Sequence, residues 1–459
     1  MNRLDTPLWA YVSAGLTRGE TEPVLATLEP LVEKHASNVM LRRAYVTTLM
    51  QAHRYREAMK HLAWLNARED GKDRETYHKY ALAAHLAGEF AHCLRICDEA
   101  IAAHPGFSQL YALRGGTWQI FGEFGKMMDD CRKAVQLDPD NMHARYALSL
   151  RELMTSGLTE GFEGYNNRLF EVEEEPIPFF GLPSWEGENI RGKTLLLIWE
   201  QGVGDMIMFA SFIPYLTSLG AKLIVTVAQK LEALFTRSFP ECEIVVVRDR
   251  QTEEALEKRA DYAVLMGHLI ELCLPRYRPA QHPPYLRADE NRAQELRQKY
   301  LAMHPDRPYL VGIAWHTTNP QTGMLRTIPL EDWRPLFNVP GVQCISLQYN
   351  ADTHPLPASL VLDTQIDAYR DLDALAAQMM AMDEIITIQN ATAHLAGALG
   401  VPTSLMLSSA SDWRWGVHDS TSAWYHSVTI LRQKEPLVWA PLMESAARAL
   451  TARTQKRRM

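Results

Sequence analysis

The spacing of apolar residues changes once along the chain. Up to about residue 165, apolar residues recur every three or four positions, which predicts amphipathic helices. From about residue 194 onward, short apolar runs rich in β-branched residues alternate with helical stretches, as parallel strands do when helices cover both faces of their sheet. The sequence therefore predicts an α + α/β fold, in which helices precede two α/β lobes.

The helical part repeats itself. Four pairs of equivalent residues are each separated by 34 residues: Pro105 and Pro139, Gly88 and Gly122, Phe90 and Phe124, and Ala100 and Ala134. Small Ala81 and Gly115 recur at one packing position. A helix pair of this period resembles the tetratricopeptide repeat, although the usual Trp-Leu-Gly opening is degraded. The stretch 51–65 reads as an earlier repeat shifted by one residue, and the stretch 156–165 as the beginning of a last one.

A generic helical bundle is the alternative to this array, and the strict period argues against it. We expect the array to occupy residues 1–165 and to offer a concave surface to an extended peptide or a partner helix. An acidic, proline-rich stretch follows, and residues 166–193 are predicted to form a linker.

Two series of strands follow the linker. Their ranges are 194–199, 222–228, 242–247 and 261–267 in the first series, and 309–315, 342–348, 384–389 and 403–408 in the second. We expect two Rossmann-like lobes, residues 194–300 and 301–459, with a C-terminal helix in the second. Ligands of such sheets bind beyond the carboxyl ends of the strands, where the distinctive stretches of this chain also lie. We therefore expect a site between the lobes.

The glycine turn EQGVGD after the first strand carries a carboxylate, Asp205, in a position where many such turns bind phosphate. No Gly-Lys-Ser/Thr follows Gly204, so the P-loop pattern fails, and Ile207 stands where the dinucleotide fingerprint needs a glycine. A carboxylate would repel a phosphate. Either Asp205 caps a helix, or the turn serves a different ligand.

Composition limits the function classes. An apolar fraction of 47% and a charged fraction of 22% are typical of a globular protein, and a net charge of -8 argues against nucleic acid as the main partner. The six cysteines form no CxxC pair and no metal-binding spacing. We expect a cytoplasmic, reduced protein without a structural metal, a signal peptide or a transmembrane segment.

Five motifs in order give a specific resemblance: EQGVGD, a Trp-containing strand followed by NP and RTIPL, then SLQ, ATAHLAGALGVP and DWRW. This set resembles the heptosyltransferase-like glycosyltransferases, and more narrowly their relatives with N-terminal tetratricopeptide repeats. The resemblance implies the glycosyltransferase B fold, with the acceptor mainly on the first lobe and the sugar nucleotide mainly on the second. It also implies inversion at the anomeric carbon without a metal or cofactor, the nucleotide sugar being a substrate.

The same resemblance implies roles for particular residues. Asp205 matches the proposed general base, and a base suits a turn that faces the acceptor. Substrate or nucleotide contacts are implied for Gln201, Gly202, Gly204, His316, Thr317, Asn319, Arg326, Gln348, Gln389, Asn390, His394 and Gly397. Gly202 and Gly204 would allow a tight turn, Arg326 would bind phosphate oxygens, and Gln348 would lie near the nucleoside.

Structural alternatives stand beside these roles. Arg326 fits a surface arginine almost as well, and His394 fits a histidine that caps its loop. The stretch ATAHLAGALG predicts a helix N-terminus whose N–H groups face a phosphate or sugar, with Gly397 close-packed on the sheet. Trp413 and Trp415 of DWRW fit either a cleft wall or a core.

One position departs from the family pattern. The family usually has Asp-Thr or Asp-Asn where this chain has Gln389-Asn390. The change removes a negative charge and adds a donor, so it indicates either a different donor sugar, such as an acidic one, or lost activity.

Three functions are therefore open. The first is transfer of a hexosyl, heptosyl or nonulosonate sugar to Ser or Thr of a protein acceptor recognised by the repeats, with flagellin as a candidate by analogy. The second is an enzyme of lipopolysaccharide or other polysaccharide assembly. The third is a non-catalytic scaffold with a degenerate transferase domain.

Overall fold

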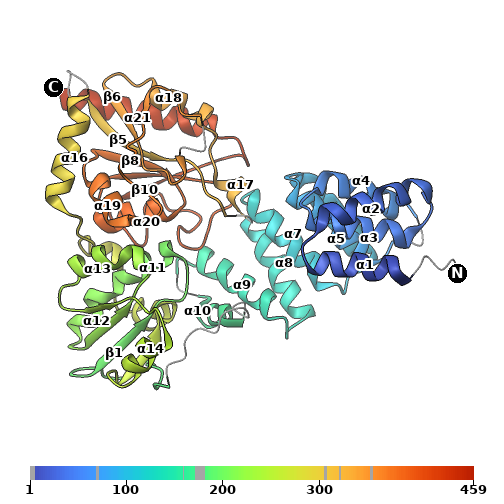
Figure 1. Ribbon diagram of the computed structural model, residues 1–459, viewed down its shortest axis with the longest axis horizontal. Coiled ribbons are helices and arrows are strands. Elements are labelled where there is room, and N and C mark those ends of the chain that lie inside the picture. Colours follow the sequence, from blue (N-terminus) through green and yellow to red (C-terminus); the bar gives the residue numbers. More distant parts are fainter. Residues whose placement is uncertain are drawn as a thin grey trace. The chain divides into compact units, whose positions relative to one another are not determined.

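The computed structural model describes residues 6–68, 72–158, 160–170, 181–303, 308–319, 322–351 and 355–458. Contacts within the chain separate two compact units, Met1–Leu148 and Ser149–Met459. The first unit is helical and the second is α/β (Figure 1).

The helical unit consists of antiparallel helix pairs. Its helices are α1 (Thr6–Thr17), α2 (Thr21–Lys34), α3 (Val39–Gln51), α4 (Tyr55–Asn66), α5 (Arg74–Leu86), α6 (Phe90–Ala103), α7 (Ser108–Ile120) and α8 (Phe124–Leu137), and α9 (Met142–Thr155) crosses into the second unit. The starts of α5 and α7, and those of α6 and α8, are 34 residues apart, as the sequence predicts. The starts of α4 and α6 are 35 residues apart, so the predicted one-residue shift is confirmed.

The turn inside each helix pair needs one residue with left-handed backbone. Gly19, Gly88 and Gly122 have φ values of 73°, 78° and 71°, which glycine adopts without steric cost. His53 takes the equivalent position with φ 58°. The degraded repeat therefore keeps its turn although it lacks the glycine that marks the turn in the sequence.

Small residues bring paired helices close together. A Cβ atom at Gly115 would lie 3.0 Å from the sulfur of Cys131, so α7 packs directly on α8. Ala81 is fully buried in the preceding pair. Cys93 and Cys97, one turn apart on α6, are also fully buried and line the core of the array.

The first sheet of the α/β unit is parallel, with strand order β3-β2-β1-β4. Its strands are β1 (Thr194–Ile198), β2 (Lys222–Thr226), β3 (Glu243–Val245) and β4 (Tyr262–Leu265). All four lie inside the predicted ranges. Its helices are α11 (Val203–Phe209), α12 (Ile213–Ser218), α13 (Glu232–Ser238), α14 (Arg250–Glu257) and α15 (Leu269–Cys273).

The second sheet is also parallel, with strand order β10-β9-β8-β5-β6-β7. Its strands are β5 (Tyr309–Ala314), β6 (Val342–Ser346), β7 (Leu360–Val361), β8 (Glu384–Ile388), β9 (Thr403–Leu407) and β10 (Val428–Arg432). The sequence predicts four of these and misses the edge strands β7 and β10. The edge strand β7 is two residues long, and β10 alternates buried and exposed residues only at its start.

Helices cover both faces of the second sheet (Figure 1). They are α16 (Glu290–Ala302), α17 (Gly323–Arg326), α18 (Arg334–Phe337), α19 (Leu372–Met380), α20 (Ala391–Leu399) and α21 (Ala440–Arg458). Buried Trp333 and Met443, from the side of α18 and α21, share one core with Val311 of β5. The fold class predicted from the sequence, helical repeats followed by two Rossmann-like lobes, is confirmed.

The predicted linker is only partly described. Residues 171–180 lie outside the described residues. On the near side, α10 (Phe162–Tyr165) and the 3-10 helix η2 (Asn166–Phe170) precede that stretch. On the far side, Ser184 forms a bridge to Ala263 of the first sheet. The boundaries at 165, 193 and 300 stay predictions. Among the described residues, no helix has the length and hydropathy needed to span a membrane.

Candidate active site

Asp205 lies in the first turn of α11, directly after the glycine turn that follows β1. The N-cap of this helix is Gly202, and no side chain caps it. The alternative that Asp205 caps the helix is therefore wrong. Its carboxylate pairs with an arginine of the second lobe.

Four charged side chains join the two lobes in one chain of ion pairs. Arg414 donates from Nε to Oδ1 of Asp205 over 2.6 Å, and its Nη2 lies 2.6 Å from the same oxygen. Nη1 of Arg414 also donates to both oxygens of Asp412, at 2.9 and 3.1 Å. Arg326 then donates to Oδ2 of Asp412 over 3.2 Å. The sequence-predicted Asp205 and Arg326 are thus connected through two residues of the DWRW motif.

The charges of this group shift one another's pKa values. Burial raises the pKa of Asp205 above its usual range, although Arg414 opposes the rise. Burial would also raise the pKa of Asp412, but Arg414 and Arg326 hold it at about 2. Despite its burial, Arg414 has a pKa well above the usual value because Asp205 and Asp412 lie beside it. Asp205 is therefore the more basic of the two carboxylates, and Asp412 stays ionised.

Asp205 has one carboxylate oxygen available for a substrate. Both contacts from Arg414 reach Oδ1. Its other oxygen, Oδ2, accepts no hydrogen bond from the residues that the structure describes. The side chain is 17% exposed, so it is not fully sealed from solvent. A partly desolvated carboxylate with a raised pKa and an open oxygen can accept a proton.

Gln201 contacts a residue outside both lobes. Its side-chain amide exchanges hydrogen bonds with the hydroxyl of Tyr165 at the end of α10, with distances of 2.9 Å from the nitrogen and 3.2 Å from the oxygen. The backbone carbonyl of Gln201 accepts a hydrogen bond from the indole of Trp199. The amide of Gln201 is thus used within the protein, and a substrate contact by this residue stays a prediction.

His394 lies where the two lobes touch. It is buried in the first turns of α20, its Nδ1 is 2.9 Å from the hydroxyl of Tyr425, and its ring stacks on Trp415 at 4.9 Å. A Cβ atom at Gly204 would lie 3.1 Å from the ring of His394, so only glycine lets α11 approach α20 this closely. Burial lowers the pKa of His394 to about 3, so the ring is neutral.

Gly397 packs on a ring and not on the sheet. A Cβ atom at Gly397 would lie 2.4 Å from the Tyr425 ring, so a side chain has no space there. The glycine of α20 thus fixes the tyrosine that bonds His394. The sequence indicates the close packing correctly but assigns it to the wrong neighbour.

The loop after β5 is held by its own hydrogen bonds. Oε1 of Gln348 accepts from the backbone N–H groups of Trp315 and His316, at 3.0 and 2.9 Å. The backbone N–H of Thr317 donates to Oγ1 of Thr327 over 3.3 Å, and Oδ1 of Asn319 accepts from the backbone N–H of Thr322 to form a turn. Their nucleotide contacts stay predictions.

Gln389 and Asn390, which depart from the family pattern, have different environments. Asn390 is the N-cap of α20 and accepts from the backbone N–H of Ala393. Gln389 is 3% exposed, and neither its side-chain nitrogen nor its side-chain oxygen has a hydrogen-bond partner among the described residues. A buried amide with no partner is costly, so a water or ligand is expected beside it.

No family model matches the sequence. The chain is 30% identical over 394 residues to Protein FlbA of Caulobacter vibrioides, and this alignment covers 79% of the chain and 64% of FlbA. The chain thus spans less than two thirds of the length of that relative.

Two solved structures each match part of the chain at low similarity. A glycosyl transferase family 9 structure from Veillonella parvula has a TM-score of 0.40 and 13% identity, covering 54% of this chain and 88% of that one. A MamA crystal structure has a TM-score of 0.32 and 18% identity, covering 38% of this chain and 97% of that one. The repeats and the two sheets themselves decide the architecture. The chain joins tetratricopeptide-like helical repeats to two Rossmann-like α/β lobes.

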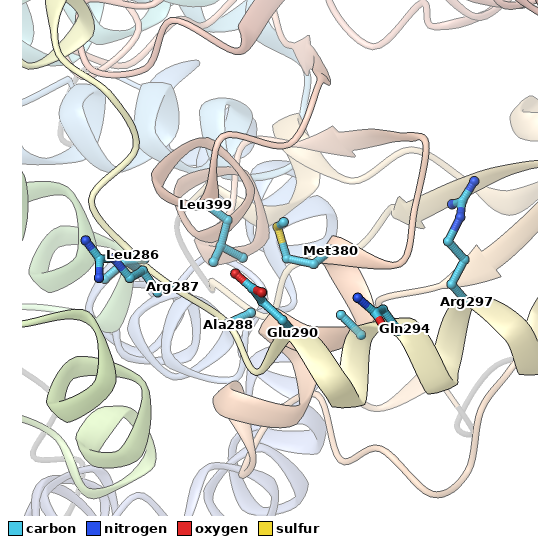
Figure 2. Close-up of a pocket in the computed structure, with 9 residues that line it drawn as sticks. Leu286, Arg287, Ala288, Glu290, Gln294, Arg297, Met380 and Leu399 are labelled. Atoms are coloured by element: carbon cyan, nitrogen blue, oxygen red, sulfur yellow. The ribbon is translucent and has the colours of Figure 1, made fainter.

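A separate cavity of about 300 Å³ is lined by none of the four residues of the ion-pair chain (Figure 2). Leu286 and Arg287 line it where the chain enters α16, and Met380 and Leu399 close it from the ends of α19 and α20. It contains none of the predicted site residues. We therefore assign the candidate site to the strand ends near Asp205 and not to this cavity.

Sequence reasoning missed several residues of the site. Only the tryptophans of DWRW were predicted to matter. In the structure Arg414 of this motif pairs with Asp205, and Asp412 pairs with Arg414. An acid and a base two residues apart in a loop after β9 were the available signal. Tyr165 and Arg168 had no such signal, because they lie where the repeat pattern fades.

Proposed function

We propose that the α/β lobes form an inverting, metal-independent glycosyltransferase that moves a sugar from a nucleotide donor to Ser or Thr of a protein acceptor. The repeats would recognise that acceptor. The observation that carries the proposal is the contact between Asp205 of the first lobe and Arg414 of the second. It brings a proton acceptor next to guanidinium groups at the carboxyl ends of two parallel sheets.

The proposed reaction uses these charges in one displacement. Oδ2 of Asp205 accepts the proton of the acceptor hydroxyl while the oxygen forms a bond to the anomeric carbon. The bond from that carbon to the nucleotide phosphate breaks on the opposite side, and the leaving group takes the electron pair. Protonation of Asp205 removes the charge that holds Arg414, so this guanidinium becomes available as the leaving group gains charge.

A buried amide and an arginine support the donor side of the proposal. Gln389, at the end of β8, has a nitrogen and an oxygen without partners among the described residues. Arg326 bonds only one oxygen of Asp412 and keeps further donors for phosphate. A neutral amide in place of the family carboxylate also suits an acidic donor sugar, which a carboxylate would repel.

Calorimetry against UDP-, GDP-, ADP- and CMP-linked sugars tests donor binding. We expect one of these donors to bind the full-length protein and Arg326→Gln to weaken that binding by about 10-fold or more, since a charge-assisted hydrogen bond contributes about 1.5–3 kcal/mol. The matched control is Arg370→Gln, because Arg370 is 84% exposed. Failure of the folded protein to bind any of the four donor classes would overturn the proposal.

The scaffold alternative has one observation in its favour. Gly204 approaches His394 closely, so the lobes already touch at the point where a donor is expected. A scaffold would leave all four donors unbound. The polysaccharide alternative would give donor binding with transfer to a glycan acceptor and none to a protein such as flagellin.

A further inference from the structure

We propose that residues 162–170, which form α10 and η2, act as a positioning element for the site between the lobes. Tyr165 holds the Gln201 turn and the Trp413–Arg414 loop against each other, and Arg168 fixes the Glu200 end of the same turn. The inference rests on the proposed function for its catalytic consequence only. The contacts of Tyr165 and Arg168 can be tested on the protein without any substrate.

Arg168 fixes the start of the turn through a buried ion pair. Its Nε and Nη2 donate to the two oxygens of Glu200, over 2.9 and 2.7 Å. The backbone N–H of Gly267 also donates to Glu200 over 2.8 Å. The side chains of Arg168 and Glu200 are 4% and 2% exposed. A bidentate pair of this kind holds one geometry, so Glu200 has a single position.

Tyr165 contacts both sides of the site. Its hydroxyl bonds the amide of Gln201 in the first lobe. The edge of its ring meets the ring of Trp413 in the second lobe, with the centroids 5.4 Å apart. The guanidinium of Arg168 lies 4.6 Å from the centroid of the Tyr165 ring. This cation–π contact stabilises the position of the tyrosine.

These contacts connect Tyr165 to the candidate base, Asp205, by two routes. The guanidinium of Arg414 lies 4.6 Å from the centroid of the Trp413 ring and bonds Asp205. Asp205 is four residues after Gln201 on the turn that Tyr165 holds. One route runs through Gln201 and the other through Trp413, and both lead from Tyr165 to the ion pair of Asp205 and Arg414.

The element is itself anchored in the α/β unit. Gly161, with φ 86°, precedes α10, and a Cβ atom there would lie 2.5 Å from the carbonyl oxygen of Ser149. Only glycine permits this approach to the second half of α9. The side chain of Asn166 donates to Glu271 of α15 over 3.2 Å. The segment is thus held at its start and again at Asn166, between the two residues that it presents.

Hydrogen exchange on the full-length protein tests the contact of Tyr165 with Gln201 separately from its contact with Trp413. The peptides to follow are 199–209 and 411–418. Tyr165→Phe removes the bond to Gln201 and keeps the ring on Trp413, so exchange should become faster in 199–209 only. Tyr165→Ala removes both contacts, so exchange should become faster in both peptides.

Tyr300→Ala is the matched control. Tyr300 is a fully buried tyrosine of the second lobe whose hydroxyl donates to Asp363 over 2.8 Å. Its loss should leave both peptides unchanged. Unchanged exchange in 199–209 for Tyr165→Phe would overturn the proposal, and this variant is conservative enough to fold. Equal effects of Tyr165→Ala and Tyr300→Ala would also overturn it.

A kinetic measurement distinguishes positioning from mere support of the fold. Tyr165→Phe should lower kcat for donor hydrolysis or transfer about 10-fold, within the loss of up to about 10²-fold that a misplacement of 1 Å produces. The KM for the donor should not change. An unchanged kcat in a wild-type protein that is active would contradict the positioning role. Absence of donor binding and turnover in the wild type would refute the proposed function and leave the exchange result valid.

Discussion

The helical array and the site between the lobes are stabilised in opposite ways. The array has an apolar core made of residues from several of its helices, such as Leu28 of α2, Leu49 of α3 and Leu110 of α7, all fully buried. The site is held by charged side chains from distant parts of the sequence, and Arg414 and Asp205 are 209 residues apart. A change in the array should therefore alter stability without altering chemistry, and a conservative charge change in the site should do the reverse.

The sharpest test of this contrast pairs two Asp→Asn changes. Asp205→Asn keeps the size of the side chain and removes the proton acceptor, so transfer should fall by about 10²–10⁴-fold. Donor affinity and the thermal midpoint should change little. The rate of transfer and the melting curve of the purified protein give both results.

Asp130→Asn is the matched change in the array. Asp130 accepts two hydrogen bonds from Arg114, at 2.8 and 2.7 Å, and is buried. This variant should lose stability and keep its transfer rate. A near-normal rate for folded Asp205→Asn protein would refute the role of Asp205 as a base.

The next effect concerns the apolar core of the array. Leu110→Ala should lower the free energy of unfolding of the array by about 2–5 kcal/mol, because it removes buried methyl groups and leaves a cavity. Met40→Ala, at a side chain that is 64% exposed, should stay within about 0.5 kcal/mol of the wild type. Urea denaturation measures both. A loss of donor affinity in Leu110→Ala would contradict the separation between stability and chemistry.

Acid should destabilise the site through His394. The pKa of His394 in the folded protein is about 3, below the ordinary value of about 6.5, so the unfolded chain takes up a proton first as the pH falls. The free energy of unfolding should therefore decrease below about pH 6.5, by ~3 kcal/mol at pH 4. Asp412, with a pKa of about 2, adds a further loss only below about pH 4.

Melting curves between pH 7 and pH 4 check this contribution. His394→Gln should flatten the dependence of stability on pH, whereas His35→Gln, an exposed position of the array, should not. An unchanged pH dependence in His394→Gln would show that other groups cause the acid sensitivity.

The smallest effect compares two glycines of one repeat. Gly122 has φ 71° and Gly125 lies inside α8, and a Cβ atom would meet nothing within 4 Å at either position. Gly122→Ala should cost about 1 kcal/mol because alanine is strained in left-handed backbone. Gly125→Ala should stabilise by up to about 1 kcal/mol because alanine favours a helix. Changes of the same sign in the two thermal midpoints would argue against the role of backbone strain in these turns.

The fold was predictable from the sequence because its signals are local and repeated. The 34-residue period marks the array, and β-branched runs mark the central strands of both sheets. His53 shows the limit of such signals, because its backbone conformation matches that of Gly88 although its residue type does not. The edge strand β10 was missed because only part of it is buried.

The site was predictable only in part. Asp205 and Arg326 were found through motifs, and the structure connects them through Asp412. The pairing of Asp205 with Arg414 depends on how two lobes close, which no local pattern encodes. The role of Tyr165 could not be predicted for a related reason. Its partners Gln201 and Trp413 lie 36 and more than 200 residues further along the chain.

The close contact of Gly161 with α9 has a consequence for protein engineering. A chimaera that exchanges the repeats with those of another protein would naturally be joined in the acidic stretch 166–193. Such a joint would replace Tyr165 and, if it lies after residue 168, Arg168 as well, so Glu200 would become a buried charge without its counterion. The breakpoint that keeps the α/β unit intact lies before Ser149. The repeat segment that can be exchanged, Met1–Leu148, is thus shorter than the array of residues 1–165 that the sequence predicts.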